Sequence, residues 1–364
     1  MLTVIHTESS KGWGGQEQRT LREVLGLKRL GHRPVILCPP DAELGRRAEA
    51  AGIEVLHAPM RKNFDLPAIF RIMRIVRELR ADVINTHSGK DSFLAGIAGR
   101  LSTLKPLIIR TRHLATPITS KTSYAVLPHK VVTVSEYVRQ YLISAGVGPD
   151  QVTAIPTGID VGRFSSGSVR GDLRKELGIP QQIPLVGTVG ILRHRKGHHI
   201  LLEAIPKVLE QFPEARFVFA GNGPLEERIR NKIDELGLAG RVLMLGLRND
   251  VPDVLAAIDL FVLPTLQEAL GTSFLEAMAM EKPVIGSNVD GVGEVIRDGV
   301  NGYLVAPGDA GLLAERIISL LADPALAARM GTAGKEMVRN GFTVERMCER
   351  MLFLYEELLS ARKS

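Results

Sequence analysis

The sequence is poor in cysteine and has no long apolar run. Its two cysteines, Cys38 and Cys348, lie far apart and show no metal-ligand spacing, which argues against a disulfide framework or a zinc site. No apolar run reaches the roughly 18 residues that a membrane span needs. The first residues, MLTVIHTESS, have neither a basic start nor a small-residue cleavage site, and they predict a strand rather than a signal peptide. We therefore expect a reduced, cytoplasmic protein.

Several ligand-binding motifs are incomplete or missing. The glycine loop GWGGQEQ (12–18) has Glu17 at the third glycine position of a dinucleotide fingerprint, and GNGPLE (221–226) has Glu226 there. The sequence has no Walker lysine motif and no Asp-x-Asp pair. Aromatic residues make up only 5%, and no nucleic-acid-binding motif is found. These absences argue against an NAD enzyme, a P-loop enzyme, a metal–diphosphate site and a nucleic-acid partner.

Charge is distributed unevenly along the chain. Residues 1–150 hold 22 Lys and Arg against 13 Asp and Glu, a net charge of +9, and the remainder holds 24 against 27, a net charge of −3. A basic first half suggests an acidic partner surface, such as an anionic membrane or a phosphorylated glycan. The alternative is that these charges only keep the surface solvated. We expect peripheral binding at the inner membrane as the weaker of the two localisation hypotheses.

Short apolar runs alternate with amphipathic stretches in both halves of the chain. In residues 66–80, for example, the apolar residues share one helical face, and Arg71, Arg74 and Arg77 lie mostly off it. Nearly continuous apolar strands between helices indicate parallel sheets covered on both faces. A Gly- and Ser-rich stretch at 162–172 separates the two halves. We predict an α/β protein with two Rossmann-like domains, 1–163 and 164–342, and a last helix within 343–364 that packs back on the first.

The stretch QEALGTSFLEAMAMEKPVIG (267–286) places two acids around a small polar turn. Ser273 and Glu276 have the spacing of a helix capping box, which would be a purely structural role. The alternative is an anion site, because a helix starting at Thr272 offers backbone N–H groups to a phosphate. Glu268 and Glu276 would then bind sugar hydroxyls on either side of a diphosphate.

Cationic and histidine side chains follow other predicted strands. Arg193 and Lys196 lie in the loop GILRHRKGHH (190–199), where they are either solvated charges or a clamp for a leaving diphosphate. His87 and His113 each follow a strand of the first half and are either structural or ligand-binding. Arg110 and Arg112 precede His113, and we expect such crowding by cations to lower its pKa. Because parallel sheets bind ligands at the carboxyl ends of their strands, these residues mark candidate sites.

At these residues the sequence resembles the retaining GT-B-fold nucleotide-sugar glycosyltransferases of family four, also called group 1. GWGGQEQ, TVSEYVRQYL (133–142), IPTGID (155–160), the RHRKG loop, AGNGP, the Glu-x7-Glu element and DGVGEVI…NGYLV occur in the family's order over nearly the whole chain. The resemblance implies two Rossmann-like domains facing across a deep cleft. There are departures: Ile191 stands where the family often has arginine, Thr157 where asparagine is usual, and Gly-Thr-Ser replaces the commoner turn.

The resemblance also implies roles for individual residues. His113, Arg193, Lys196 and Glu268 would be catalytic. Glu17 and His87 would contact the acceptor. The implied donor-binding residues are Gly15, Arg193, Lys196, Asn222, Gly223, Arg248, Leu270, Gly271, Thr272, Ser273 and Glu276.

The implied reaction is sugar transfer from a nucleotide diphosphate to a hydroxyl of a glycan or glycolipid in bacterial cell-envelope polysaccharide or lipopolysaccharide synthesis, with retention. A UDP-sugar is favoured over a GDP-sugar as donor, and no cofactor or metal is expected. The base, sugar, acceptor, linkage and oligomeric state do not follow from the sequence. Two rivals share the fold: an inactive nucleotide-sugar-binding subunit, and a nucleotide-sugar 2-epimerase, which would lack the Glu-x7-Glu element.

Overall fold

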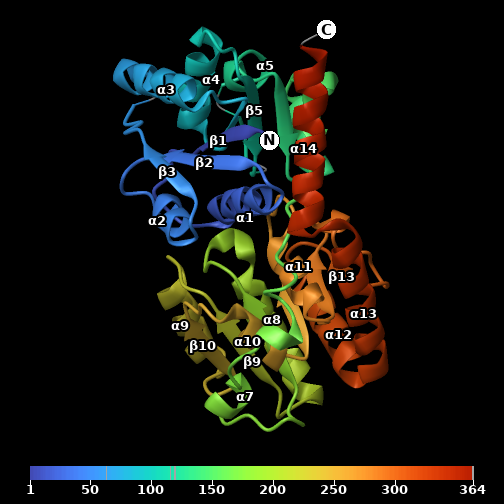
Figure 1. Cartoon of the computed structure of the whole chain (residues 1–364). Coiled ribbons are helices and arrows are strands. Elements are labelled where there is room, and N and C mark those ends of the chain that lie inside the picture. Colours follow the sequence, from blue (N-terminus) through green and yellow to red (C-terminus); the bar gives the residue numbers. More distant parts are fainter. Residues whose placement is uncertain (63, 115, 119, 363–364) are drawn as a thin grey trace. The chain divides into compact units, whose positions relative to one another are not determined.

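The computed structural model describes residues 1–62, 64–114, 116–118 and 120–362. The described chain forms two compact units, each with its own parallel sheet (Figure 1). The first unit comprises residues 1–158 and 343–364, and the second comprises residues 159–342. Each unit is therefore described by itself.

The first unit is a seven-stranded parallel sheet in the order β3-β2-β1-β4-β5-β6-β7. Its strands are β1 (Thr3–Thr7), β2 (Arg33–Cys38), β3 (Glu54–His57), β4 (Val83–Thr86), β5 (Leu107–Arg112), β6 (Lys130–Thr133) and β7 (Val152–Ala154). Its helices are α1 (Gly15–Arg29), α2 (Glu43–Ala50), α3 (Leu66–Leu79), α4 (Gly89–Leu101), α5 (Thr122–Ala125), α6 (Glu136–Ser144), the short 3-10 turn η1 (Pro149–Gln151) and α14 (Val344–Ala361).

Helix ends in this unit follow local chemistry. The Asp65 side chain accepts a hydrogen bond from the Ala68 N–H at the start of α3, and Pro67 fits the first turn because the N–H groups there need no helical partner. Ser135 caps α6 in the same way by accepting from the Val138 N–H. The strands β2, β4 and β5 are almost entirely buried, as expected for a sheet covered on both faces, whereas the edge strand β3 is partly exposed.

The helix α14 belongs to the first unit, although the second unit separates it from that unit in sequence. Its buried residues Met347, Cys348, Met351 and Tyr355 share one apolar cluster with residues of α1 and of the central strands, including Val4. In Figure 1 this red helix runs beside the blue and green first unit. The last helix is thus part of the first unit's core.

The second unit is a six-stranded parallel sheet in the order β10-β9-β8-β11-β12-β13. Its strands are β8 (Leu185–Val189), β9 (Arg216–Ala220), β10 (Val242–Gly246), β11 (Leu260–Leu263), β12 (Val284–Ser287) and β13 (Gly302–Val305). Its helices are α7 (Leu173–Glu176), α8 (His198–Gln211), α9 (Glu226–Glu235), α10 (Val251–Ala257), α11 (Thr272–Ala279), α12 (Ala310–Ala322) and α13 (Pro324–Gly341), and its 3-10 turns are η2 (Ser166–Ser168), η3 (His194–Lys196) and η4 (Val292–Glu294).

Both sheets reverse their strand order at one point, between β1 and β4 in the first unit and between β8 and β11 in the second. In open parallel sheets, ligands bind beyond the carboxyl ends of the strands at such a point. The loops after β8 and β11 carry Lys196 and Glu268, and His87 and His113 follow β4 and β5. The two units therefore each present predicted site residues where the topology favours a ligand.

The boundary between the units lies at Gly158 and Ile159, a few residues before the predicted division at 163 and 164. The Gly- and Ser-rich stretch 162–172 begins within the second unit and contains η2. Ser165 and Ser168 bond to neighbouring backbone there, so the small residues form a local turn instead of a free linker.

Candidate functional site

The second unit pairs two predicted catalytic residues directly. The Lys196 ammonium and the Glu268 carboxylate form an ion pair, and their side chains are only 17% and 18% exposed. Lys196 ends η3 after β8, and Glu268 lies in the loop between β11 and α11. The pair therefore joins the loops that follow two strands, through two residues that are 72 positions apart in sequence.

Backbone contacts hold these two loops together. The Arg195 carbonyl oxygen accepts hydrogen bonds from the Leu266 N–H at 2.7 Å and from the Thr265 hydroxyl at 2.7 Å. Gly197 follows with a φ of +69°, and a side chain there would collide with the Pro264 carbonyl oxygen. Glycine is therefore required at 197, because the two loops approach too closely for any Cβ.

A third strand end fixes the backbone of Glu268. Its N–H donates to the Asp290 carboxylate at 2.9 Å, and its carbonyl oxygen accepts from the Gly291 N–H at 3.1 Å. Asp290 follows β12 and has a φ of +46°, a left-handed conformation that aspartate tolerates better than most residues. Asp290 was not among the predicted site residues, although an Asp-Gly pair after a strand is a turn signal.

The helix α11 begins at Thr272, with Gly271 as its N-cap at a φ of +94°. Ser273 thus lies inside the helix, so the capping-box interpretation of Ser273 and Glu276 is wrong. Gly271 allows the left-handed turn, and the first N–H groups of the helix have no partner four residues back. Leu270 is buried, and Thr272, Ser273 and Glu276 are partly exposed at this helix start.

The glycine loop after β9 packs against the cationic loop after β8. The Leu192 N–H donates to the Asn222 carbonyl oxygen at 2.9 Å, and the Leu225 N–H donates to the Leu192 carbonyl oxygen at 3.1 Å. Gly223 lies against the same Leu192 backbone. Arg193, next to Leu192, is exposed at the start of η3. The Asn222–Gly223 turn therefore has a clear structural role, and its contact with a donor remains a prediction.

Arg248 has carboxylate partners of its own. Its guanidinium bonds to Glu176 at 2.8 and 3.1 Å and to Asp250 at 2.9 and 2.6 Å, and these bonds raise its pKa. A donor phosphate at Arg248 would have to compete with both carboxylates. The donor contact predicted for Arg248 stays a prediction.

In the first unit, the predicted residues Gly15 and Glu17 form the start of α1. Gly15 is exposed, and a side chain there would meet no atom within 4 Å. Glu17 is buried, and its carboxylate accepts from the Gly14 N–H at 2.8 Å. Glu17 therefore stabilises the helix start, which is a structural role beside the predicted acceptor contact.

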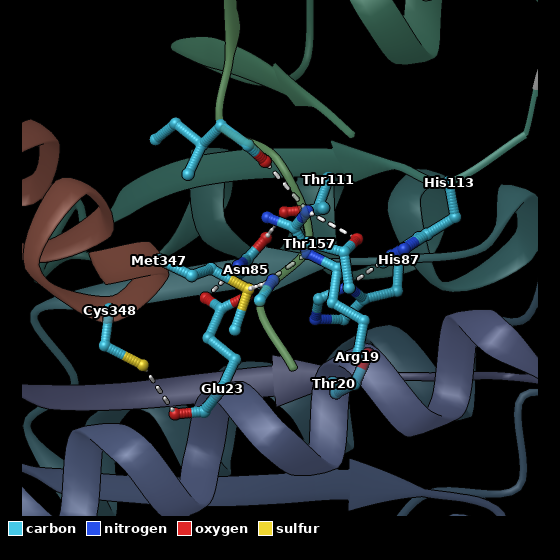
Figure 2. A network of polar contacts seen from close by, with 12 residues as sticks. Arg19, Thr20, Glu23, Asn85, His87, Thr111, His113, Thr157, Met347 and Cys348 are labelled. Atoms are coloured by element: carbon cyan, nitrogen blue, oxygen red, sulfur yellow. Dashed lines mark hydrogen bonds and ion pairs between the residues drawn. The ribbon is translucent and has the colours of Figure 1, made fainter. Parts of the chain in front are cut away.

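His87 and His113 lie in one row of buried imidazoles. His87 Nδ1 is 3.0 Å from His113 Nε2, and His87 Nε2 is 3.1 Å from His6 Nδ1 (Figure 2 shows the first of these contacts). The pKa of His113 is well below its usual value, first because of burial and then because of Arg19 and Arg112. The direction expected from neighbouring cations is confirmed, but burial is the larger cause. His6 was missed because it lies within a strand.

Two buried acids, Glu8 and Asp91, complete this edge of the sheet. Asp91 accepts from the His87 N–H at 2.9 Å and from the Thr7 hydroxyl at 2.8 Å. Glu8 accepts from Gln16 Nε2 at 2.6 Å, and burial next to Asp91 raises its pKa to about 8. Ser88 and Asp91 form a capping box at the start of α4, and their spacing before an apolar helix is the sequence signal that could have identified Asp91.

Among the described residues, no group of three or more His, Cys, Asp and Glu side chains is arranged to hold a metal ion. Within the same residues, every helix is too short or too polar to cross a bilayer.

Two Rossmann-like units, each with predicted site residues near its switch point, have the architecture of the class of GT-B proteins. Comparison with known families agrees for each half of the chain. Residues 13–163 match the model described as "Glycosyltransferase Family 4", and residues 169–337 match "Glycosyl transferases group 1". The chain therefore belongs to the family-four, group 1 glycosyltransferases and is an enzyme of that type.

Individual relatives differ from this chain at most of the aligned positions. The chain is 26% identical over 312 residues to an Escherichia coli protein named UDP-Gal:alpha-D-GlcNAc-diphosphoundecaprenol alpha-1,3-galactosyltransferase, covering 81% of this chain and 80% of that one. It is 33% identical over 181 residues to the lipopolysaccharide core biosynthesis glycosyltransferase LpsE of Rhizobium meliloti, covering 50% and 52%.

Two solved structures share the fold of the whole chain. The glycosyltransferase from Rickettsia africae aligns with a TM-score of 0.87 at 22% identity, covering 98% of both chains. Anabaena Alr3699/HepE, solved in complex with UDP and glucose, aligns with a TM-score of 0.84 at 22% identity, covering 98% of this chain and all of that one. At this identity the likeness establishes the GT-B fold.

Proposed function

We propose that this enzyme transfers a sugar from a UDP-sugar to a hydroxyl of a glycan or glycolipid, with retention of anomeric configuration and without a metal ion. A GDP-sugar is the alternative donor. The names of the relatives support a product in cell-envelope polysaccharide or lipopolysaccharide synthesis. The observation that carries the proposal is the Lys196–Glu268 pair beside the start of α11.

The second unit supplies what a nucleotide diphosphate requires. Lys196 and Arg193 would neutralise the negative charge that develops on the leaving diphosphate, and the N–H groups at the start of α11 would bind its oxygens. Glu268 would bind hydroxyls of the transferred sugar, and Glu276 those of the ribose. These fixed charges make a metal ion unnecessary in the proposed reaction.

Retention follows in this proposal from attack on the leaving-group side of the sugar. A phosphate oxygen takes the proton of the acceptor hydroxyl while the glycosyl–phosphate bond breaks, so no protein nucleophile forms a bond. His113 acts at the transferred sugar, and Glu17 and His87 act on the acceptor side.

A transfer assay tests this function directly. The purified enzyme is incubated with UDP- or GDP-sugars and a polyprenyl-diphosphate-linked sugar acceptor, with and without EDTA. Release of UDP that requires the acceptor and persists in EDTA supports the proposal. The coupling constant between the anomeric carbon of the product and its proton gives the stereochemistry. Inversion, or activity only with added metal, would contradict it. Interconversion of the free nucleotide sugar at C2 would indicate an epimerase.

We also propose that α3 and Phe64, just before it, rest on an anionic membrane surface. Phe64, Leu66 and Phe70 are 62%, 50% and 66% exposed, which is unusual for large apolar side chains. Residues 61–80 carry six Lys and Arg against two acids. Exposed apolar side chains beside basic ones suit the boundary between anionic headgroups and acyl chains.

Vesicle sedimentation tests this surface with a matched pair of variants. The wild type should bind phosphatidylglycerol vesicles at low salt, release them at high salt, and ignore phosphatidylcholine vesicles. Phe70→Ser should weaken binding, whereas Phe353→Ser should not, although Phe353 on α14 is 70% exposed. Equal losses in both variants, or binding that does not depend on salt, would remove the proposed surface.

A further inference from the structure

Three histidines of the first unit form a continuous hydrogen-bonded row from the middle of the sheet to its carboxyl edge. His6 lies in β1, His87 follows β4, and His113 follows β5. The facing nitrogens are 3.1 and 3.0 Å apart, within hydrogen-bond distance at both junctions. His6 is fully buried, His87 is 3% exposed and His113 is 8% exposed. The row thus starts in the core and ends at the ring nearest to solvent.

The two contacts couple the tautomers of all three rings. The pKa of each ring lies below its usual value, mainly because of burial, so the rings are neutral near pH 7 and each carries one N–H. A hydrogen bond between two neutral imidazoles needs one N–H and one bare nitrogen. Only two arrangements satisfy both contacts, with the proton either on Nε2 of every ring or on Nδ1 of every ring.

A carboxylate at the buried end distinguishes these two arrangements. Glu23 on α1 accepts from the Tyr355 hydroxyl and from Asn85 Nδ2, both at 3.2 Å, which identifies it as a hydrogen-bond acceptor. Among the described residues, Glu23 Oε2 and His6 Nε2 are both buried and have no hydrogen-bond partner, and Glu23 Oε2 forms a buried ion pair with Arg19 Nε at 3.8 Å. Glu23 raises the pKa of His6, and His6 Nδ1 faces His87, so the negative charge favours an N–H on the remaining nitrogen, His6 Nε2, over a lone pair there.

The buried guanidinium of Arg19 opposes this effect only in part. Arg19 donates to the Ile155 carbonyl oxygen at 2.8 Å and to the Thr157 hydroxyl at 3.1 Å, and Figure 2 shows it reaching from α1 toward Thr157. It lowers the pKa of all three histidines, which keeps the row neutral. At His6, however, the raising effect of Glu23 on the pKa exceeds the lowering effect of Arg19.

We propose that Glu23 and His6 are positioning residues that act through His87 to hold His113 in the Nε2–H tautomer. His113 Nε2 then donates to His87, and Nδ1 is the bare nitrogen that His113 offers to a ligand. This inference rests on the proposed role of His113 at the transferred sugar. His113 therefore accepts a hydrogen bond from a sugar hydroxyl, and neither Glu23 nor His6 touches the substrate.

Nitrogen NMR tests the tautomers without any substrate. Protein labelled with ¹⁵N-histidine is examined at pH 7.5 by long-range ¹H–¹⁵N correlation, which separates protonated from bare ring nitrogens. The expected spectrum has Nε2 protonated and Nδ1 bare in His6, His87 and His113. Protonation of Nδ1 in His113, or different tautomers among the three rings, would overturn the proposal.

Variants show whether the row sets the tautomer. His6→Phe keeps a ring in place but removes the acceptor for His87, so His113 should become a mixture of tautomers. Glu23→Gln should shift His113 in the same direction, because it removes the charge with little change in shape. The control His129→Asn, at a half-buried histidine whose Nδ1 accepts from the Ile108 N–H, should leave His113 unchanged. An unchanged His113 in both variants would overturn the proposal, and the wild-type spectrum still decides it if a variant fails to fold.

Turnover gives a second readout. In His6→Phe, kcat should fall about tenfold, roughly the effect of one misdirected hydrogen bond, while the KM for the donor stays within about twofold. If kcat is unchanged in a variant in which His113 is a mixture of tautomers, the three histidines do not contribute to catalysis through the tautomer of His113. If the wild type transfers no sugar, the proposed function fails, but the tautomers measured by NMR are unaffected.

Discussion

The Lys196 ammonium forms an ion pair with the Glu268 carboxylate. A donor phosphate would compete with that carboxylate for the ammonium. The sequence predicted both as site residues, because a Lys-Gly loop and a Glu-x7-Glu element each follow a strand. It did not predict their ion pair, which depends on the close approach of Gly197 to Pro264. Contacts between residues 72 positions apart arise from backbone geometry, which local patterns do not contain.

Substitution of this pair should affect turnover far more than stability. Lys196→Met and Glu268→Gln should each lower kcat roughly 10²- to 10³-fold, because each removes a charge placed at the reacting groups. The free energy of unfolding should change by only about 1 kcal/mol, since the pair retains some exposure. Urea titration and the transfer assay measure the two effects separately.

The matched control is Lys207→Met, which breaks the exposed pair between Lys207 and Glu315 in the same unit. Its turnover should equal that of the wild type. A loss of turnover there as large as in Lys196→Met would refute the assigned site.

The raised pKa of Glu8 predicts how the free energy of unfolding depends on pH. Its pKa is raised by burial to about 8 in the folded protein, against 4.5 for an ordinary glutamate, so the folded state holds a proton that the unfolded state has lost. Its contribution to stability is complete below about pH 4.5 and is lost as the pH rises through 8. Glu8→Gln should remove this loss.

The measurement is the difference in the free energy of unfolding, obtained by urea titration, between wild type and Glu8→Gln at pH 5, 6.5 and 8. The buried histidines change stability with pH in the opposite direction, and taking the difference cancels their contribution. The wild type should lose stability relative to the variant across this range. A constant difference would mean that Glu8 titrates normally.

Helices were easier to predict than their contacts. The apolar face predicted for residues 66–80 agrees closely with α3 (Leu66–Leu79), and the last helix predicted within 343–364 is α14 (Val344–Ala361). The start of α11 at Thr272 agrees with the helix start predicted for an anion site, whereas the capping box suggested by the Ser273–Glu276 spacing is absent because the N-cap is Gly271. The packing of α14 on α1 depends on a small residue, Gly26, which no periodicity identifies.

Gly26→Ala should destabilise the first unit through this helix contact. The new methyl group would collide with Cys348 Sγ and lie 3.0 Å from the nearest Val344 side-chain carbon. Overpacking of this kind typically costs about 1–3 kcal/mol. Chemical unfolding of Gly26→Ala should show a loss within that range.

The double variant Gly26→Ala/Cys348→Ala tests the mechanism, because it removes the sulfur that the methyl group meets. It should recover part of the loss relative to the sum of the single variants. Strict additivity would show that the cost lies in the α1 backbone instead of in this contact.

At the scale of the whole molecule, the chain passes between its two units twice, at neighbouring points. The Ile159 N–H donates to the Phe342 carbonyl oxygen at 2.8 Å, and Gly158 lies against the Thr343 backbone. The strand–helix alternation predicted two Rossmann-like units, and the family resemblance predicted their class. The exact crossing point was not predicted, because the Gly- and Ser-rich segment at 162–172 gives a stronger linker signal than the crossing itself.

Each unit has its own buried core, so a ligand held by the second unit should stabilise that unit first. A nucleoside diphosphate at about 100 times its Kd should raise the unfolding temperature of the second unit by roughly 5–10 °C. Glu276→Gln should reduce the shift, because the proposed contact with the ribose hydroxyls weakens.

The most direct test of the central claim is a thermal unfolding series with UDP, GDP, ADP and NAD, each with and without EDTA. We predict that UDP raises the unfolding temperature, that EDTA does not change this shift, and that NAD has no effect. Stabilisation by NAD alone would contradict the account. Stabilisation by a nucleoside diphosphate only when a metal ion is present would contradict the metal-independent site built on Lys196 and the start of α11.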